Sequence, residues 1–117
     1  MTQDVPQPIN IAQFEELRDL LEEDFNDLIQ TYINDSEIRL SELENAYTNN
    51  DNRLGFEAAH SLKGASSNLG ASTLSELCYQ LQEVCRNTQI QQHRELVDKV
   101  IAECRAVNTH AKQLLAQ

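Results

Sequence analysis

AAHSLKGASSNLGAS, residues 58–72, lies in a segment whose apolar side chains recur at helical spacing. The segment predicts an amphipathic helix that buries one face and ends near Gly70, because glycine suits a helix C-terminus. Its apolar stripe consists of Leu54, Ala58, Leu62, Ala65 and Leu69. At about 100° per residue, this stripe lies roughly 120° to 200° away from His60, so the imidazole is predicted to point into solvent.

A lysine and a glycine share the predicted exposed face with His60. Lys63 and Gly64 follow the histidine by one helical turn. A glycine inside a helix costs about 1 kcal/mol relative to alanine, which indicates that open space beside the imidazole is needed. The ammonium of Lys63 would attract an anion attached to the ring. The arrangement indicates a histidine that carries or meets a phosphate, on a surface that Phe56 and Ser67 extend.

Four other segments show the same helical period. They are a short one at residues 11–21, a long one at 23–48, one that begins with a possible capping box at Thr73-x-x-Glu76, and a last one from Leu96 to the end of the chain. Asp51 is predicted to cap the helix that carries His60, and residues 87–92 are predicted to form a polar turn.

The helical segments predict one all-α domain. Four long segments with short links and one apolar face each pack most simply as an antiparallel up-down four-helix bundle, with an additional short N-terminal helix laid against it. We expect residues 1–10 to be an N-terminal lead-in and residues 11–117 to form the bundle domain, since 117 residues suit a single core.

The charge is unevenly distributed along the chain. The net charge is −10, with −11 in residues 1–59 and +1 in residues 60–117. An acidic chain without a basic stripe repels phosphate backbones, so we expect a protein partner and no nucleic acid. No apolar run approaches the roughly 20 residues that span a bilayer, so we expect a cytoplasmic protein without membrane contact.

The three cysteines are predicted to be small buried hydrophobic residues. Cys78, Cys85 and Cys104 fall on apolar helical stripes, and no C-x-x-C pair indicates a zinc or redox site.

The chain around His60 resembles the histidine-containing phosphotransfer (Hpt) domain family of phosphorelays. The family pattern H-x-L-K-G-x-x-x-x-L-G is matched by His60, Leu62, Lys63, Gly64, Leu69 and Gly70, and a downstream C-x-x-L-Q/E element by Cys78, Leu81 and Gln82. Many members carry a serine where this chain has Ala65. The resemblance implies a stand-alone phosphorelay intermediate that passes a phosphoryl group between receiver domains.

The resemblance also implies roles for individual residues. His60 would be phosphorylated on Nε2, Lys63 would steady the phosphoryl group, and Gly64 would leave space for it. Gln82, on the neighbouring helix, would orient the ring. The partners would be receiver domains and a hybrid sensor histidine kinase, with the receiver supplying Mg²⁺, so that this chain, expected to be a monomer, would need no cofactor or metal.

Other interpretations of the same residues remain open at this point. Phe56 could dock the receiver, together with Ser67, or it could pack against the first short helix. Glu57-x-x-His60 could belong to a carboxylate-bridged metal site, although neither His93 nor His110 has an acidic residue three positions earlier. The bundle could also bind a partner without being phosphorylated. A histidine kinase is excluded because the chain has no ATP-binding domain or Gly-rich phosphate loop, and His93 and His110 are expected to be ordinary surface side chains.

Overall fold

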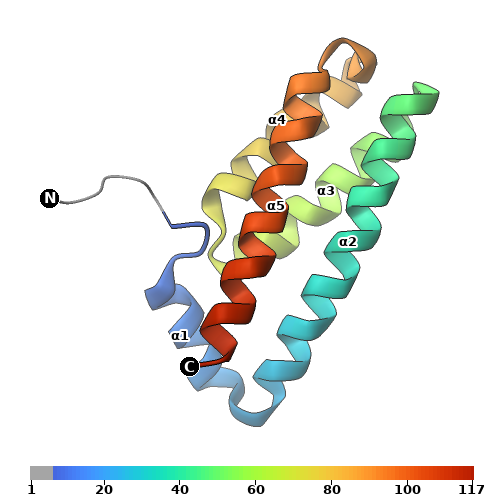
Figure 1. Ribbon diagram of the computed structural model, residues 1–117. Coiled ribbons are helices and arrows are strands. Elements are labelled where there is room, and N and C mark those ends of the chain that lie inside the picture. Colours follow the sequence, from blue (N-terminus) through green and yellow to red (C-terminus); the bar gives the residue numbers. More distant parts are fainter. Residues whose placement is uncertain (1–6) are drawn as a thin grey trace, which may run out of the picture.

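The computed structural model describes residues 7–117 and confirms the all-α expectation. Its helices are α1 (Ile11–Leu21), α2 (Phe25–Asn49), α3 (Asn52–Leu69), α4 (Ser72–Arg86) and α5 (Arg94–Leu115), with short 3₁₀ turns η1 (Glu22–Asp24) and η2 (Ile90–Gln92). No strand occurs in the described part. In Figure 1, α2 to α5 run up and down the long axis in turn, and α1 lies across the end where α2 begins and α5 stops.

The end of the bundle beneath α1 is closed by aromatic side chains and one arginine. Phe14, fully buried on α1, meets Phe25 edge-to-face at a ring-centroid distance of 5.0 Å. The guanidinium of Arg18 lies over both rings and donates a hydrogen bond to the Leu114 carbonyl at 2.8 Å. The short helix is therefore fixed to both α2 and the end of α5.

The residues just before α1 also belong to the packed structure. Ile9 is fully buried, and its N–H lies 3.3 Å from Nδ1 of His110, which accepts the hydrogen bond. Asn10 caps α1 by accepting from the Gln13 N–H at 2.9 Å. His110 is thus a half-buried anchor rather than the ordinary surface side chain that the sequence suggested, and His93 is half-buried as well. Of the expected lead-in, residues 1–6 lie outside the described part.

The turns at the two ends of α3 follow local backbone preferences. Asp51 accepts from the Leu54 N–H at 3.0 Å, which confirms the predicted cap. Gly70 ends the helix with φ of 91°, a left-handed conformation that favours glycine. The predicted capping box at Thr73 is wrong, because α4 begins at Ser72 and its N-cap position is Ala71, a fully buried residue whose N–H bonds to the Ser66 carbonyl.

Polar and apolar exceptions to the simple helical pattern have structural explanations. Ser36, which interrupts the apolar stripe of α2, is buried, donates to the Ile33 carbonyl at 2.8 Å and accepts from Nδ2 of Asn108 on α5 at 2.9 Å. The turn at 87–92, predicted to be polar, contains the fully buried Ile90.

The three cysteines are free and buried as predicted, and desolvation raises the pKa of the Cys85 and Cys104 thiols to about 11.

Helices α3 and α4 approach each other closely at Gly55. A Cβ on this glycine would lie 2.7 Å from Sγ of Cys85 and 2.9 Å from Cδ1 of Ile90. The buried glycine therefore allows α4 and η2 to pack directly against the backbone of α3.

None of the helices in the described range combines the length and apolar character needed to cross a bilayer.

Gly55→Ala should lower the free energy of unfolding by about 1–2 kcal/mol, because overpacking outweighs the gain in helix propensity. Gly64→Ala is the matched control on the same helix, since a Cβ there meets nothing within 4 Å. The control should gain about 0.5–1 kcal/mol. Urea unfolding of the three proteins measures both effects. Equal stabilisation by the two substitutions would contradict the close approach of α3 and α4.

Candidate functional site

The centre of the candidate site is His60, an exposed residue in the middle of α3. The opposite face of the same helix is buried and consists of Gly55, Ala58, Ala59, Leu62, Ser66 and Leu69. Since the helix is held by its buried face, the imidazole stands on a rigid support and is open to solvent, as the helical periodicity predicts.

A hydrogen bond from the neighbouring helix fixes one nitrogen of the imidazole. Nδ1 of His60 lies 2.9 Å from Oε1 of Gln82 on α4, and Gln82 is 4% exposed. An amide oxygen can only accept, so the proton of the neutral ring resides on Nδ1. The lone pair is therefore on Nε2, the ring nitrogen that Gln82 leaves free.

The other end of the Gln82 amide leads to a chain of charged and aromatic groups. Its Nε2 donates to Oε2 of Glu83 at 3.1 Å, and Glu83 in turn accepts from Nε of Arg86 at 3.1 Å. The pKa of Glu83 is lowered by the hydrogen bond from Gln82 and by Arg86, so this side chain is a carboxylate at neutral pH.

Phe56 contacts both the histidine and the arginine. Its ring is stacked on the imidazole with a centroid distance of 5.9 Å and an interplanar angle of 7°, and the Arg86 guanidinium lies 5.1 Å from its centroid. Phe56 therefore packs against His60 and Arg86, in place of the contact with the first helix that the sequence left open. Glu83 and Arg86 were missed in the sequence, although their mutual spacing of three residues is typical of an ion pair on a helix.

Lys63 and Gly64 lie one turn along from His60. Nζ of Lys63 is 5.5 Å from the ring centroid of Tyr79 on α4, a contact that leaves the ammonium near the surface. The position above Gly64 is open space. The structure thus leaves room beside the imidazole and holds a cation nearby, and Tyr79 is a further neighbour that the sequence did not single out.

Ser67 lies farther along the same face and borders a polar hollow. Its side chain is exposed, and its carbonyl accepts from Nε2 of Gln13 on α1 at 3.1 Å. The hollow is lined by Gln13, Lys63, Ser67, Gly70, Ser72, Ser75, Glu76 and Tyr79 and has a volume of about 450 Å³. It extends the surface around His60 towards the N-terminus of α4.

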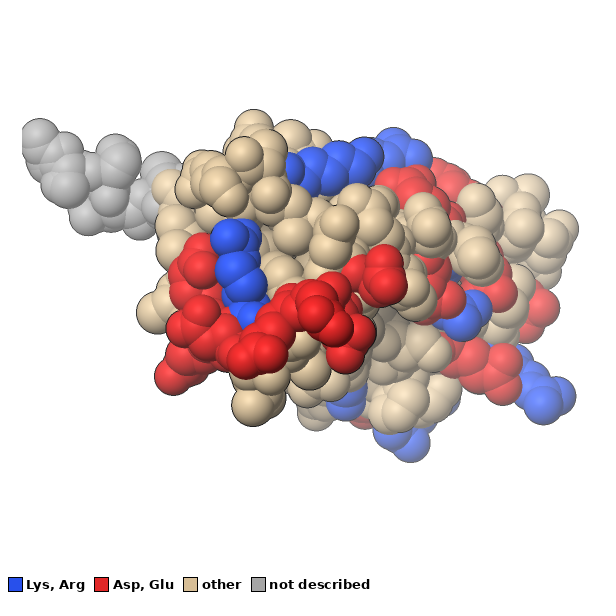
Figure 2. All heavy atoms as spheres, turned by 90° about the horizontal axis from the view of Figure 1, so that it is seen from below, with Lys and Arg blue, Asp and Glu red and all other residues tan. Residues whose placement is uncertain are grey.

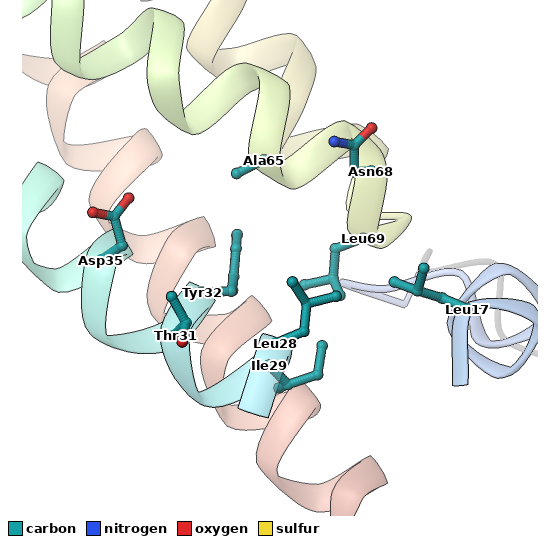
Figure 3. A pocket seen from close by; sticks show the side chains of 9 residues that line it. All are labelled: Leu17, Leu28, Ile29, Thr31, Tyr32, Asp35, Ala65, Asn68 and Leu69. Carbon is teal, nitrogen blue, oxygen red and sulfur yellow. The ribbon is translucent and has the colours of Figure 1, made fainter. Parts of the chain in front are cut away.

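An apolar groove runs along the other side of α3. Figure 3 shows Leu28, Ile29 and Tyr32 of α2 facing Ala65 and Leu69 of α3, with Leu17 of α1 at one end. The groove has a volume of about 290 Å³, and Leu28 is 42% exposed in it. The hydroxyl of Tyr32 is within hydrogen-bond distance of Oγ of Ser66, at 3.1 Å. Exposed apolar surface of this kind is typical of a contact site for another protein.

The acidic residues are concentrated at one end of the molecule. Figure 2, a view onto the end that carries α1, shows acidic side chains gathered across it. The exposed ones on α1, η1 and the first turn of α2 are Glu16, Asp19, Glu22, Glu23, Asp24 and Asp27. The surface around His60 is instead bordered by Lys63 and Arg86.

No group of three or more histidine, cysteine or acidic side chains within residues 7–117 is arranged to hold a metal ion. Glu57, the acidic partner that a metal site would need, lies 3.5 Å from Nε of Arg53.

Comparisons with known proteins agree on one family. Residues 27–117 match the Hpt domain family. The fold is similar to the crystal structure of histidine-containing phosphotransfer protein B (HptB) from Pseudomonas aeruginosa PAO1, with a TM-score of 0.86 and 30% sequence identity over 93% of this chain and 95% of that one. A search of curated proteins found no match.

Proposed function

The chain belongs to the Hpt domain family, and on this premise we propose that His60 accepts a phosphoryl group from the aspartate of one receiver domain and passes it to another. Hpt domains interact with receiver domains in phosphorelays and lack the ATP site of a kinase, so the phosphoryl group has to come from a partner. The observation that carries the proposal is the exposed imidazole, with Nδ1 engaged by Gln82 and open space over Gly64.

The reaction needs a nucleophile in line with the bond that breaks. Nε2 of His60 attacks the phosphorus as the aspartyl O–P bond breaks, and the bonding pair stays on the aspartate oxygen. The ring keeps its Nδ1 proton and gains a positive charge, which the carbonyl oxygen of Gln82 stabilises. The return step reverses these changes, so the proposed reaction requires positioning and electrostatics and no general base on this chain.

Lys63 is suited to meet the phosphoryl oxygens. Its flexible side chain can leave the Tyr79 ring and reach across the space above Gly64. Because water screens a surface ammonium, its attraction for the phosphoryl group should contribute about 0.2–1 kcal/mol. The receiver would supply the Mg²⁺ and the acidic pocket, and a hybrid sensor histidine kinase would supply the first phosphorylated receiver.

The docking surface is proposed to be centred on His60 and to include Phe56, Ser67 and the apolar groove. A receiver that buries about 800 Å² on each partner covers a patch of roughly 16 Å radius. Ala65 and Asn68, which line the groove, are about 7.5 Å and 12 Å from His60 along the axis of α3. A receiver that is aligned with the imidazole and also covers the flank of α3 would reach the groove, where its apolar side chains would cover Leu28.

The acceptor assignment is tested by His60→Gln. Label from a phosphorylated receiver should move to the wild-type protein as an acid-labile phosphohistidine and should not move to the variant. His93→Gln is the control and should still accept label. If receiver binding is normal but the wild-type protein takes up no label, the chain is an interaction module rather than a phosphotransfer intermediate.

Gly64→Ala separates folding from transfer. The variant should be more stable than the wild type, for the reason given above, and yet transfer phosphoryl groups on the order of tenfold more slowly, because a methyl group displaces the partner from its in-line position. Quench-flow measurement of transfer from a phosphorylated receiver provides the rate. An unchanged rate would show that the open space over Gly64 is not needed.

Leu28→Ala tests the docking surface. The loss of an interface leucine should weaken receiver binding about fivefold, with the transfer rate at saturating receiver unchanged. Leu20→Ala is the matched control, because Leu20 is 77% exposed and does not line the groove. Equal affinities of the two variants, measured by isothermal titration, would exclude the groove from the interface.

A further inference from the structure

The orientation of the Gln82 amide determines which nitrogen of His60 is free to react. With Oε1 towards the ring, Nδ1 carries the proton and Nε2 has the lone pair. With the amide turned by 180°, its NH₂ group would donate to Nδ1, and the proton of the neutral ring would move to Nε2. The second arrangement has nearly the same shape but blocks the nucleophile.

The contact on the far side of the amide distinguishes these two arrangements. Nε2 of Gln82 lies 3.1 Å from Oε2 of Glu83, and an ionised carboxylate can only accept. Glu83 is itself held in place by Nε of Arg86, at 3.1 Å and 3.3 Å from its two oxygens. A turned amide would place two acceptor oxygens against each other at a partly buried position, which is unfavourable.

We propose that Glu83 is a positioning residue that sets the tautomer of His60 through Gln82. The proposal rests on the proposed function, because it concerns the reactivity of the same imidazole. Glu83 holds the NH₂ end of the amide, the carbonyl end holds the Nδ1 proton, and Nε2 keeps the lone pair that attacks phosphorus.

The same contacts act on the charge that develops during transfer. When the Nε2–P bond forms and the aspartyl O–P bond breaks, the ring becomes positive while the Nδ1 proton stays in place. The hydrogen bond to Gln82 then becomes charge-assisted, and the carboxylate of Glu83 polarises the amide in the favourable direction. When the Nε2–P bond breaks in the return step, its electron pair returns to the ring, and the neutral Nδ1–H tautomer is restored.

The test uses substitutions that change the hydrogen-bonding character of residue 83. Glu83→Gln can accept or donate, so it should lower the ratio of the Nδ1–H to the Nε2–H tautomer about fivefold, the factor that one hydrogen bond of ordinary net strength provides. Glu83→Lys can only donate, so it should turn the amide and make the Nε2–H tautomer the major form. Nitrogen-15 NMR of the His60 ring reports the tautomer without any receiver present.

The transfer kinetics should follow the tautomer. The rate at saturating receiver should fall by up to about fivefold in Glu83→Gln and further in Glu83→Lys, with little change in the KM for the receiver. Glu76→Lys, the same charge change at an exposed position of α4, is the NMR control and should leave the His60 tautomer unchanged.

Repeating the Glu83→Lys substitution in a Gln82→Glu variant tests whether the effect passes through the Gln82 amide. In Gln82→Glu the side chain at position 82 is a carboxylate, which accepts from Nδ1 whatever residue 83 is, so adding Glu83→Lys should no longer change the tautomer. A wild-type tautomer in both Glu83 variants, or an equal effect of Glu83→Lys in the two backgrounds, would overturn the proposal. Absence of label transfer to the wild-type protein would instead overturn the proposed function, since the tautomer is measured independently.

Discussion

The hydrogen bond between Nδ1 of His60 and Gln82 is the contact on which the candidate site depends. It joins two helices, so its length is determined by how closely α3 and α4 pack. Gly55 permits that approach by leaving room for Cys85. Because the helices are antiparallel, five residues forward on α3 from Gly55 and three residues back on α4 from Cys85 lead to His60 and Gln82. The close packing of Gly55 against Cys85 therefore brings His60 and Gln82 within hydrogen-bond distance.

The site combines a fixed nitrogen with open surroundings. Buried side chains of α3 hold the backbone, Phe56 restrains one face of the imidazole, and Gln82 engages Nδ1. Around the exposed edge the side chains are small or mobile: Gly64 contributes no atoms, and Lys63 is a flexible cation. Such an arrangement suits a group that has to present the same atom to different partners while the partner supplies most of the reaction's environment.

Much of the fold and the centre of the site follow from single-helix periodicity. The spacing of apolar residues predicts the helices, and the angle between His60 and the apolar stripe of α3 predicts an exposed ring. The contacts among Phe56, Glu83 and Arg86 do not follow, because they depend on how α3 and α4 are rotated against each other. The capping box at Thr73 failed because the turn before α4 is fixed by other bonds: the Asn10 N–H donates to the Gly70 carbonyl, and the Ala71 N–H donates to the Ser66 carbonyl at the end of α3.

The buried pair of Ser36 and Asn108 restricts how α2 and α5 can move against each other. Sliding α5 by one turn would bring Cys104 or Ala111 opposite the Ser36 hydroxyl and break its hydrogen bond with Asn108. The hydroxyl would keep its bond to the Ile33 carbonyl, but the unpaired Asn108 amide would cost about 1–3 kcal/mol, whereas an apolar interface could shift with a smaller penalty. The pair consequently fixes one axial registry between α2 and α5, so the bundle that carries the imidazole resists shear between these two helices.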